Sequence, residues 1–305
     1  MQGSEQIRRG RLLQGDGPIF GNRVFYVTDN VRHWIMDAEW CGENGFSWPD
    51  DVQKVSDTDL VCIPLGRPAA RKWNVDKQAN QLAENQLQMR AIAASFLHGS
   101  GIEFGAASNP LPIPLACRVE YADVLTYEEL LGRLYPGQSA ENMVKPRIQA
   151  SIDDLSNISE GVDFIASAHV IEHIRDPIGA IVHAAGKLRP GGQMLLFVPD
   201  MTQTFDCARP LTTLNHLILD FYSASEERDR VHFQEFYRVA FTTPPERYEA
   251  TWTKAWQDRF PIHYHTWTYE SFRSMIEWII ASSHVYKGYW SHPTRGNEFC
   301  FVLQK

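Results

Sequence analysis

The stretch between residues 100 and 200 constrains the fold more than any other part of the chain. Short apolar runs at residues 101–105, 162–167 and 194–198 alternate with segments of helical patterning. This alternation predicts parallel β-α-β units with helices on both faces of a sheet. Ligands in such folds bind at the carboxyl ends of the strands, so the residues that follow each run are the candidate site residues.

The turn after the first run is built from small side chains. A strand that ends near Glu103 is followed by Gly105, Ala106 and Ala107, and Asn109 comes shortly afterwards. Small residues let the backbone turn sharply and approach a ligand closely. An ordinary strand-to-loop turn is the alternative interpretation.

A second strand-like run ends in an acidic residue, Asp123, eighteen positions after Gly105. A carboxylate at that place can accept two hydrogen bonds from the hydroxyls of a ribose. Asp123 could instead cap the helix expected over residues 127–135, but Thr126 is better placed to do so. We therefore favour the ribose role.

The loop after residues 162–167 contains three residues suited to chemistry. His169, Glu172 and His173 stand at positions i, i+3 and i+4, before a helix that Asp176 and the following proline are expected to begin. On one helical turn, all three side chains project from one side, which suits a metal site or a general base with an orienting carboxylate. A purely structural role is the third interpretation.

An Arg-Pro-Gly-Gly sequence at residues 189–192 closes this region. It is expected to end a helix over residues 178–188 and to lead into a strand over residues 194–198, because proline stops a helix and glycine adopts positive φ.

Together these motifs resemble the class I S-adenosylmethionine-dependent methyltransferases, in the same order and at similar distances. The resemblance implies a Rossmann-like, seven-stranded and mostly parallel sheet with helices on both faces. It also implies S-adenosylmethionine as the cofactor. The first turn departs from the family pattern, because only one glycine remains where two or three are usual.

The resemblance assigns roles to individual residues. The methionine end of the cofactor would lie at Glu103, Gly105, Ala106, Ala107 and Asn109, and its ribose at Asp123. The adenine ring would lie against Asp153, Asp154 and Leu155, without a choice between the two acids, and His169 would shape the same site. The catalytic residues would be His173, Glu172 and His265.

Whether a divalent metal binds at His169, Glu172 and His173 stays open. Some family members that methylate hydroxyls bind a divalent metal through Glu-x-x-Glu-His, and here His169 replaces the first glutamate. Other members carry a His-x-x-x-His sequence without a metal. No residue is assigned as a metal ligand.

Residues 1–72 are expected to form a small α+β module, and residues 73–305 the methyltransferase domain. The module resembles a small repeat of bacterial surface and carbohydrate-related proteins, on its Tyr-Val, Arg-His-Trp-Ile and Ile-Pro-Leu-Gly segments. A hairpin is expected over residues 23–35. Its tryptophans, Trp34, Trp40 and Trp48, could stack on sugars, although packing in a small core is the more frequent role. A helix is expected over residues 76–98.

An insertion at about residues 201–262 separates the fifth strand from the last elements. Because it leaves from the carboxyl end of that strand, it is expected to form a helical lid that selects the acceptor. It contains polar and aromatic residues, among them Thr204, Asp206, Arg209, His216, Asp220, Tyr222, His232 and Glu235. His265 and Trp267 follow it and could face the acceptor, or form a rim and a packed core. A helix capped by Thr268 comes next, and a final hairpin is expected from residues 284–290 and 298–303, joined by residues 291–297.

Composition restricts the partners. The formal net charge of −8 argues against a surface for nucleic acid, because phosphate binding needs clustered Lys and Arg. The five scattered cysteines indicate neither a disulfide framework nor a zinc knuckle. The N-terminus lacks an apolar signal region and no run reaches the length of a membrane span, so a cytoplasmic protein is expected. The oligomeric state stays open.

The expected reaction is methyl transfer to oxygen, on a hydroxyl of a sugar, glycan or related small molecule. The fourth strand ends in Ser-Ala-His, not in the Asn-Pro-Pro-Tyr type that the family uses on amino groups of bases. Three alternatives remain: an N- or C-methyltransferase of a natural product, a nicotinamide oxidoreductase, and a non-catalytic protein that binds S-adenosylmethionine. The oxidoreductase is disfavoured because the glycine-rich fingerprint is absent.

Overall fold

The chain divides into two compact units. A computed structural model describes residues 10–16, 23–35, 38–63, 69, 84–135, 140, 143–240 and 243–305. The first unit comprises residues 1–99 with 112–118, and the second comprises residues 100–111 with 119–305. The expected boundary between residues 72 and 73 lies outside the described residues and stays a prediction.

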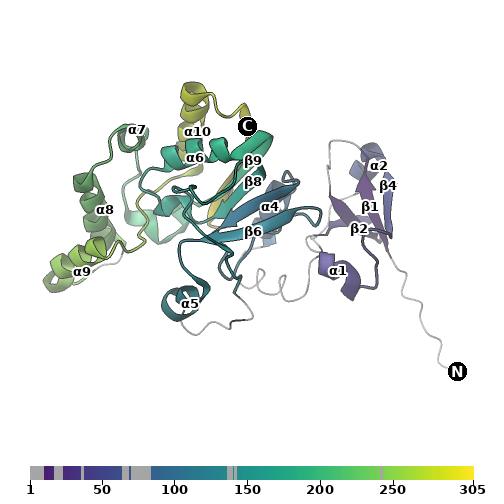
Figure 1. Ribbon diagram of the computed structural model, residues 1–305, viewed down its shortest axis with the longest axis horizontal. Coiled ribbons are helices and arrows are strands. Elements are labelled where there is room, and N and C mark those ends of the chain that lie inside the picture. Colours follow the sequence, from purple (N-terminus) through teal and green to yellow (C-terminus); the bar gives the residue numbers. More distant parts are fainter. Residues whose placement is uncertain are drawn as a thin grey trace. The chain divides into compact units, whose positions relative to one another are not determined.

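The second unit is built on a seven-stranded sheet in the order β10-β11-β9-β8-β5-β6-β7. Figure 1 labels β6, β8 and β9 among these strands. Its strands are β5 (Ser100–Phe104), β6 (Arg118–Asp123), β7 (Ile148–Gln149), β8 (Val162–Ala168), β9 (Leu188–Pro199), β10 (Gly288–Arg295) and β11 (Glu298–Gln304). The pairs β5–β8, β8–β9 and β6–β7 are parallel, while β11 runs antiparallel to both β9 and β10. This order confirms the expected Rossmann-like fold. It also places the carboxyl ends of the neighbouring strands β8, β5 and β6 at the same end of the sheet.

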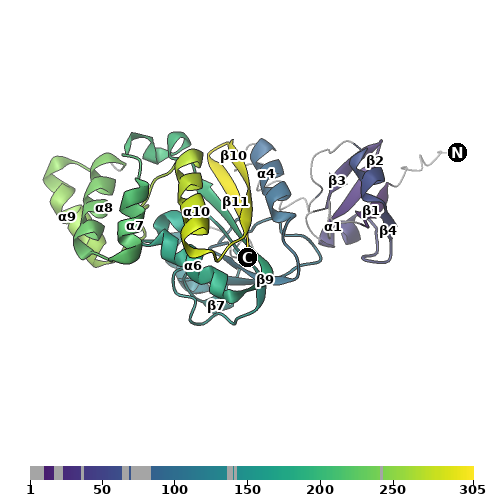
Figure 2. The same cartoon turned by 90° about the horizontal axis from the view of Figure 1, so that it is seen from above.

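Two helices with predicted caps cover part of this sheet. Helix α6 (Pro177–Lys187) begins after Asp176, whose side chain accepts the Gly179 N–H at 2.8 Å. Helix α10 (Tyr269–Ser283) begins at its cap Thr268, as expected. Figure 2 shows α6 and α10 side by side, and α6 packs against β9. The apolar side chains of both helices join one core with those of the sheet.

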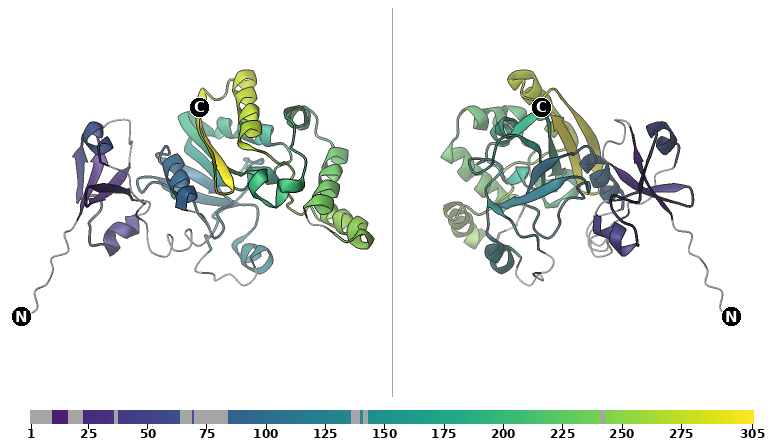
Figure 3. Two further views of the ribbon diagram at one scale, coloured as in Figure 1. Left: turned by 180° about the vertical axis from the view of Figure 1, so that it is seen from behind. Right: turned by 45° about the vertical axis from the view of Figure 1, so that its right-hand side comes forward.

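The insertion after β9 is helical. It contains the 3-10 turns η4 (Met201–Gln203) and η5 (Phe205–Ala208), and the helices α7 (Leu214–Tyr222), α8 (Glu226–Val239) and α9 (Pro245–Gln257). Helices α8 and α9 pack against each other (Figure 3), and they share a separate buried cluster that includes Phe233, Trp252 and Ile262. A second core explains how this segment keeps its own shape.

Some expected boundaries differ from the structure. The helix expected at residues 127–135 starts as α5 (Tyr127–Glu129), capped by Thr126, and continues as the π-helical turn η1 (Leu130–Leu134). The joining segment of the last hairpin is shorter than expected, because β10 extends to Arg295 and keeps pairing with β11 after a bulge. The helix expected over residues 76–98 is described as α4 (Glu84–Ala94); it ends four residues earlier than expected, and residues 76–83 lie outside the described residues.

The first unit contains a four-stranded sheet in the order β3-β2-β1-β4. The strands are β1 (Arg11–Gly15), β2 (Val24–Thr28), β3 (Val31–Trp34) and β4 (Val52–Val55), accompanied by α1 (Ala38–Glu43) and α2 (Asp57–Val61). The β2–β3 hairpin is the expected one, with Asp29 and Asn30 at positive φ. Trp34 is buried, and Trp40 and Trp48 pack against the core of the unit. Their packing favours the core role over sugar stacking.

Among the described residues, no helix has both the length and the apolar character that crossing a membrane requires.

Candidate functional site

The turn after β5 has the backbone shape that its small residues indicate. Gly105 adopts φ +68° and Ala107 adopts φ +43°. A Cβ atom on Gly105 would come within 2.6 Å of Cγ2 of Val170, which belongs to the loop after β8. The Gly105 N–H donates to the Ala122 carbonyl of β6 at 3.0 Å. The turn is therefore held close to the ends of both neighbouring strands.

Glu103 and Asn109 take part in the same turn. The buried Glu103 carboxylate accepts the Leu111 N–H through Oε1 at 2.8 Å. The Asn109 N–H donates to the Ala106 carbonyl at 2.8 Å. These bonds show that Glu103 braces the turn from inside. Its contact with a ligand stays a prediction.

Asp123 is the last residue of β6, beside the turn in which Gly105 follows β5. Its Oδ1 accepts the Leu125 N–H at 2.9 Å. Burial raises the pKa of Asp123 above its ordinary value, and backbone hydrogen bonds from Leu125 and Val124 oppose this only in part. The structure thus brings the two halves of the expected cofactor site together.

The three adenine candidates differ in exposure. Leu155 is buried in the core of the unit, while Asp153 and Asp154 are exposed. Asp154 Oδ1 accepts the Ser156 N–H at 3.1 Å, and hydrogen bonds from Ser156 lower the pKa of Asp154. The Ser151 hydroxyl donates to Asp153. Both carboxylates have local partners, so the structure does not choose between them.

The loop after β8 holds His169 in a strained conformation. His169 adopts φ +55°, which is uncommon for a residue other than glycine and is found often at functional sites. Its Nε2 lies 2.9 Å from Oε2 of the fully buried Glu298, and its Nδ1 lies 3.8 Å from Oε1 of Glu172. Glu298 is the first residue of β11. It was not among the expected site residues.

Glu172 is a buried carboxylate with few partners. It lies in the short 3-10 turn η3 (Ile171–His173), is 0% exposed, and neither carboxylate oxygen has a hydrogen-bond partner among the described residues. Its backbone carbonyl accepts the Tyr264 N–H at 2.7 Å. Because burying an unpaired carboxylate is costly, this group is a strong candidate for interaction with a ligand or a proton.

His173 is held in one tautomer. Its Nδ1–H donates to the Ile262 carbonyl at 2.9 Å, which leaves the lone pair on Nε2. Burial lowers the pKa of His173, although the neighbouring Glu172 opposes this shift. The ring meets the ring of His263 edge-on, with 4.7 Å between centroids. His173 is therefore neutral near pH 7 and can accept a proton at Nε2.

His263 is supported by a buried carboxylate. Its Nδ1–H donates to Oδ2 of Asp206 at 2.7 Å, and the Arg209 Nη1 lies 2.8 Å from the other oxygen of Asp206. Burial alone would raise the pKa of Asp206, but hydrogen bonds from His263 and Arg209 leave it below its ordinary value. Asp206 and Arg209 come from the insertion, which thus contributes to the site. The sequence pattern alone gives neither residue a specific role.

His265 lies in a different group from His173. Its buried ring donates from Nε2 to the Arg175 carbonyl at 3.0 Å, and burial lowers its pKa to about 4. It neighbours His216, Asp220 and His232, and burial lowers the pKa of His232 to about 3. The imidazole of His265 does not belong to the group formed by Glu172, His173 and His263. A catalytic role for His265 remains a prediction without geometric support here.

Two groups in the described part of the chain have ligand atoms all within 4.8 Å of one another, as metal binding requires. One consists of Glu172, His173 and His263, and the other of His216, Asp220, His232 and His265. His169 belongs to neither, so the geometry does not support the metal that the sequence left open at His169, Glu172 and His173. A surface cavity of about 460 Å³ along α9 is lined by residues outside both groups.

Comparison with known proteins gives one match to a family model. The model described as a methyltransferase domain matches residues 75–278. No curated protein matches the sequence. Among solved structures, an S-adenosylmethionine-dependent methyltransferase from Thermotoga maritima is 13% identical, covering 77% of this chain and 96% of its own, with a TM-score of 0.40. An O-methyltransferase family protein from Burkholderia thailandensis is 11% identical, with a TM-score of 0.39. The match covers 76% of this chain and 58% of that protein.

Proposed function

This chain belongs to the S-adenosylmethionine-dependent methyltransferases, and from that premise we propose that it methylates a hydroxyl oxygen on a sugar, glycan or related small molecule. The observation that carries the choice of oxygen is the neutral, oriented imidazole of His173. A hydroxyl must lose its proton as it attacks, and a positioned base is the group that receives it.

The residues at the carboxyl edge of the sheet fit the cofactor. Bound S-adenosylmethionine supplies a methyl group on a positively charged sulfonium. The positive φ of Gly105 would turn the backbone toward the methionine part, and the missing Cβ leaves room for Val170 beside the turn. Asp123 would accept hydrogen bonds from the ribose hydroxyls. Either Asp153 or Asp154, with the Leu155 backbone, would border the adenine.

The proton then has a defined destination. We assign Nε2 of His173 as the atom that accepts the hydroxyl proton, since Nδ1 is already bound to the Ile262 carbonyl. The imidazolium that forms is stabilised by the adjacent, buried Glu172 carboxylate. His263, oriented by Asp206, lies against the ring of His173, and its Nε2 lone pair could accept a hydrogen bond from a second hydroxyl of the acceptor.

The test is an acceptor panel with the purified full-length protein. Sugars and glycans with free hydroxyls are compared with amines and with carbon nucleophiles, and methylated products are identified by mass spectrometry. We expect O-methylated products. N- or C-methylated products alone would overturn the choice of oxygen, and cofactor binding without any product would favour a non-catalytic binding protein.

The role of His173 is tested by His173→Gln, with His183→Gln on the exposed face of α6 as the control. Loss of a general base lowers kcat by about 10²–10⁴-fold. We expect that loss in His173→Gln, with the affinity for S-adenosylmethionine unchanged by calorimetry, and no change in His183→Gln. Equal turnover of the two variants would remove His173 from the reaction while leaving methyl transfer in place.

A further inference from the structure

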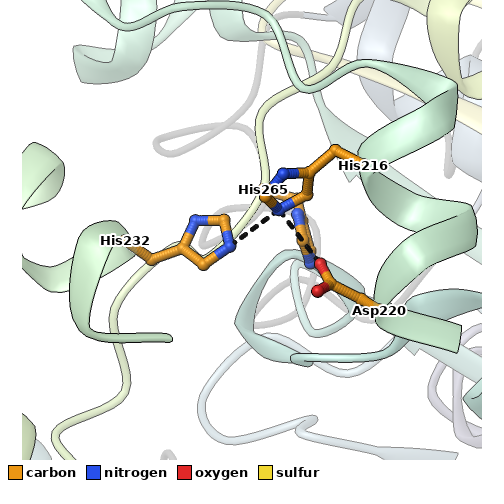
Figure 4. Close-up of side chains that lie close together, drawn as sticks. All are labelled: His216, Asp220, His232 and His265. Atoms are coloured by element: carbon orange, nitrogen blue, oxygen red, sulfur yellow. Dashed lines mark hydrogen bonds and ion pairs between the residues drawn. The ribbon is translucent and has the colours of Figure 1, made fainter. Parts of the chain in front are cut away.

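Four side chains from three separate segments converge in the second unit. His216 and Asp220 come from consecutive turns of α7, His232 from α8, and His265 from the segment before α10 (Figure 4). Their rings and carboxylate point toward one another, and one ligand atom of each lies within 4.8 Å of all the others. We call these four residues the His3Asp cluster.

Hydrogen bonds alone account poorly for this arrangement. Nε2 of His216 lies 3.0 Å from Nε2 of His232 and 3.0 Å from Oδ2 of Asp220. A single ring N–H can point at only one of those two atoms. Nδ1 of His265 is buried and has no hydrogen-bond partner among the described residues. The cluster therefore brings more lone pairs together than its protons can satisfy.

The surroundings of the cluster orient its lone pairs inward. The Nε2–H of His265 donates to the Arg175 carbonyl, so Nδ1 of the same ring carries the lone pair. This lone pair has no hydrogen-bond partner among the described residues and could bind a metal. The other carboxylate oxygen of Asp220 accepts a hydrogen bond from Nε of Arg228 at 2.6 Å. Metal-ligating histidines and carboxylates are commonly held by outer hydrogen bonds of this kind.

We propose that the His3Asp cluster is a binding site for a divalent transition metal of the zinc class. Three imidazole nitrogens and one carboxylate oxygen suit Zn²⁺ in tetrahedral coordination. The 3.0 Å separations around His216 are near the roughly 3.3 Å edge of a tetrahedron with Zn–N bonds of about 2.0 Å. Because all four ligands come from the protein, the metal has no open position for substrate and is structural.

The position of the cluster gives the metal a function. It would join α7 and α8 of the insertion to the segment that contains His265. Two residues before His265 stands His263, and the same segment contributes the Ile262 carbonyl to His173. The metal would thus fix the segment that orients both histidines of the candidate active site.

The experiment measures metal content and binding on the full chain, purified without a polyhistidine tag. We expect one equivalent of zinc per chain by mass spectrometry of the metal. After removal of the metal with a chelator, Zn²⁺ titrated by calorimetry should bind with the same stoichiometry. Co²⁺ in its place should give the intense visible absorption of a tetrahedral site.

Variants locate the metal. His216→Gln is expected to abolish stoichiometric binding, and because this side chain is partly exposed, the variant is expected to fold. Arg228→Gln keeps all four ligands and should lower the affinity about 10–100-fold without changing the stoichiometry. His183→Gln should bind as the unmodified protein does.

The outcomes separate the cluster from its alternatives. Absence of Zn²⁺ and Co²⁺ binding by the unmodified chain would overturn the proposal, and so would unchanged binding by His216→Gln. Loss of binding in His173→Gln but not in His216→Gln would place the metal at Glu172, His173 and His263 instead. If the unmodified protein binds Zn²⁺ but methylates none of the acceptors, the metal site is supported and the proposed function is wrong.

Discussion

Replacing Gly105 by alanine tests whether the turn after β5 depends on both its backbone conformation and its lack of a side chain. An L-residue in the left-handed region costs roughly 1–2 kcal/mol. Gly105 has φ +68°, and the added Cβ would lie 2.6 Å from Cγ2 of Val170. Overpacking of this kind adds typically about 1–3 kcal/mol. We therefore expect Gly105→Ala to lower the free energy of unfolding by roughly 2–5 kcal/mol.

The assay is urea denaturation, and Gly186→Ala is the matched control. Gly186 lies on the exposed face of α6, and a Cβ there would meet no atom within 4 Å. Alanine is favoured over glycine in helices by up to about 1 kcal/mol, so alanine at this position in the last turn of α6 should change stability in the opposite direction. Calorimetry on the folded Gly105→Ala variant should also show weaker binding of S-adenosylmethionine.

A double variant separates the two contributions. If the contact with Val170 matters, Gly105→Ala will cost less in a Val170→Ala background, with a coupling energy of roughly 0.5–3 kcal/mol. Additive effects would refute the steric part of the reasoning. A Gly105→Ala variant as stable as Gly186→Ala would refute the whole of it.

Three further predictions concern charged groups of the site. Burial raises the pKa of Asp123, so the folded protein loses stability as pH rises through that pKa and the carboxylate becomes charged. Asp123→Asn removes this charge. At neutral pH, thermal denaturation should therefore show that the unliganded variant is more stable than the unmodified protein. The same variant should bind S-adenosylmethionine roughly 10–100-fold more weakly by calorimetry, because charge-assisted hydrogen bonds are lost. As pH falls, kcat/KM should decline with an inflection below the ordinary histidine value of 6.5, since burial lowers the pKa of His173; an inflection above it would count against this base. Arg209→Met leaves the buried Asp206 carboxylate without its cation and should cost about 3–5 kcal/mol in urea denaturation, whereas Arg273→Met, at a surface ion pair, should cost under about 1 kcal/mol.

Local sequence patterns were sufficient for most of the larger unit. The fold follows from strand and helix periodicity, and Asp176, Thr126 and Thr268 cap helices where their residue types indicated. Such features depend on contacts within a few residues, which the sequence displays directly. The start and end of the final hairpin were less well predicted, because the pairing of β10 with β11 depends on register.

Local patterns in the sequence were enough to predict the Rossmann-like sheet and to put Gly105 and Asp123 at the carboxyl ends of neighbouring strands. Folding brings His173 against His263, His263 against Asp206 and His169 against Glu298, and the members of these pairs are 57 to 129 residues apart in the sequence. It also places His265, which the sequence assigned to the catalytic residues, among the four side chains of the His3Asp cluster, and its catalytic role stays a prediction. The physical reason is that strand and helix patterns reflect local periodicity, whereas side chains on an insertion and a final hairpin meet only after the sheet has brought their ends together.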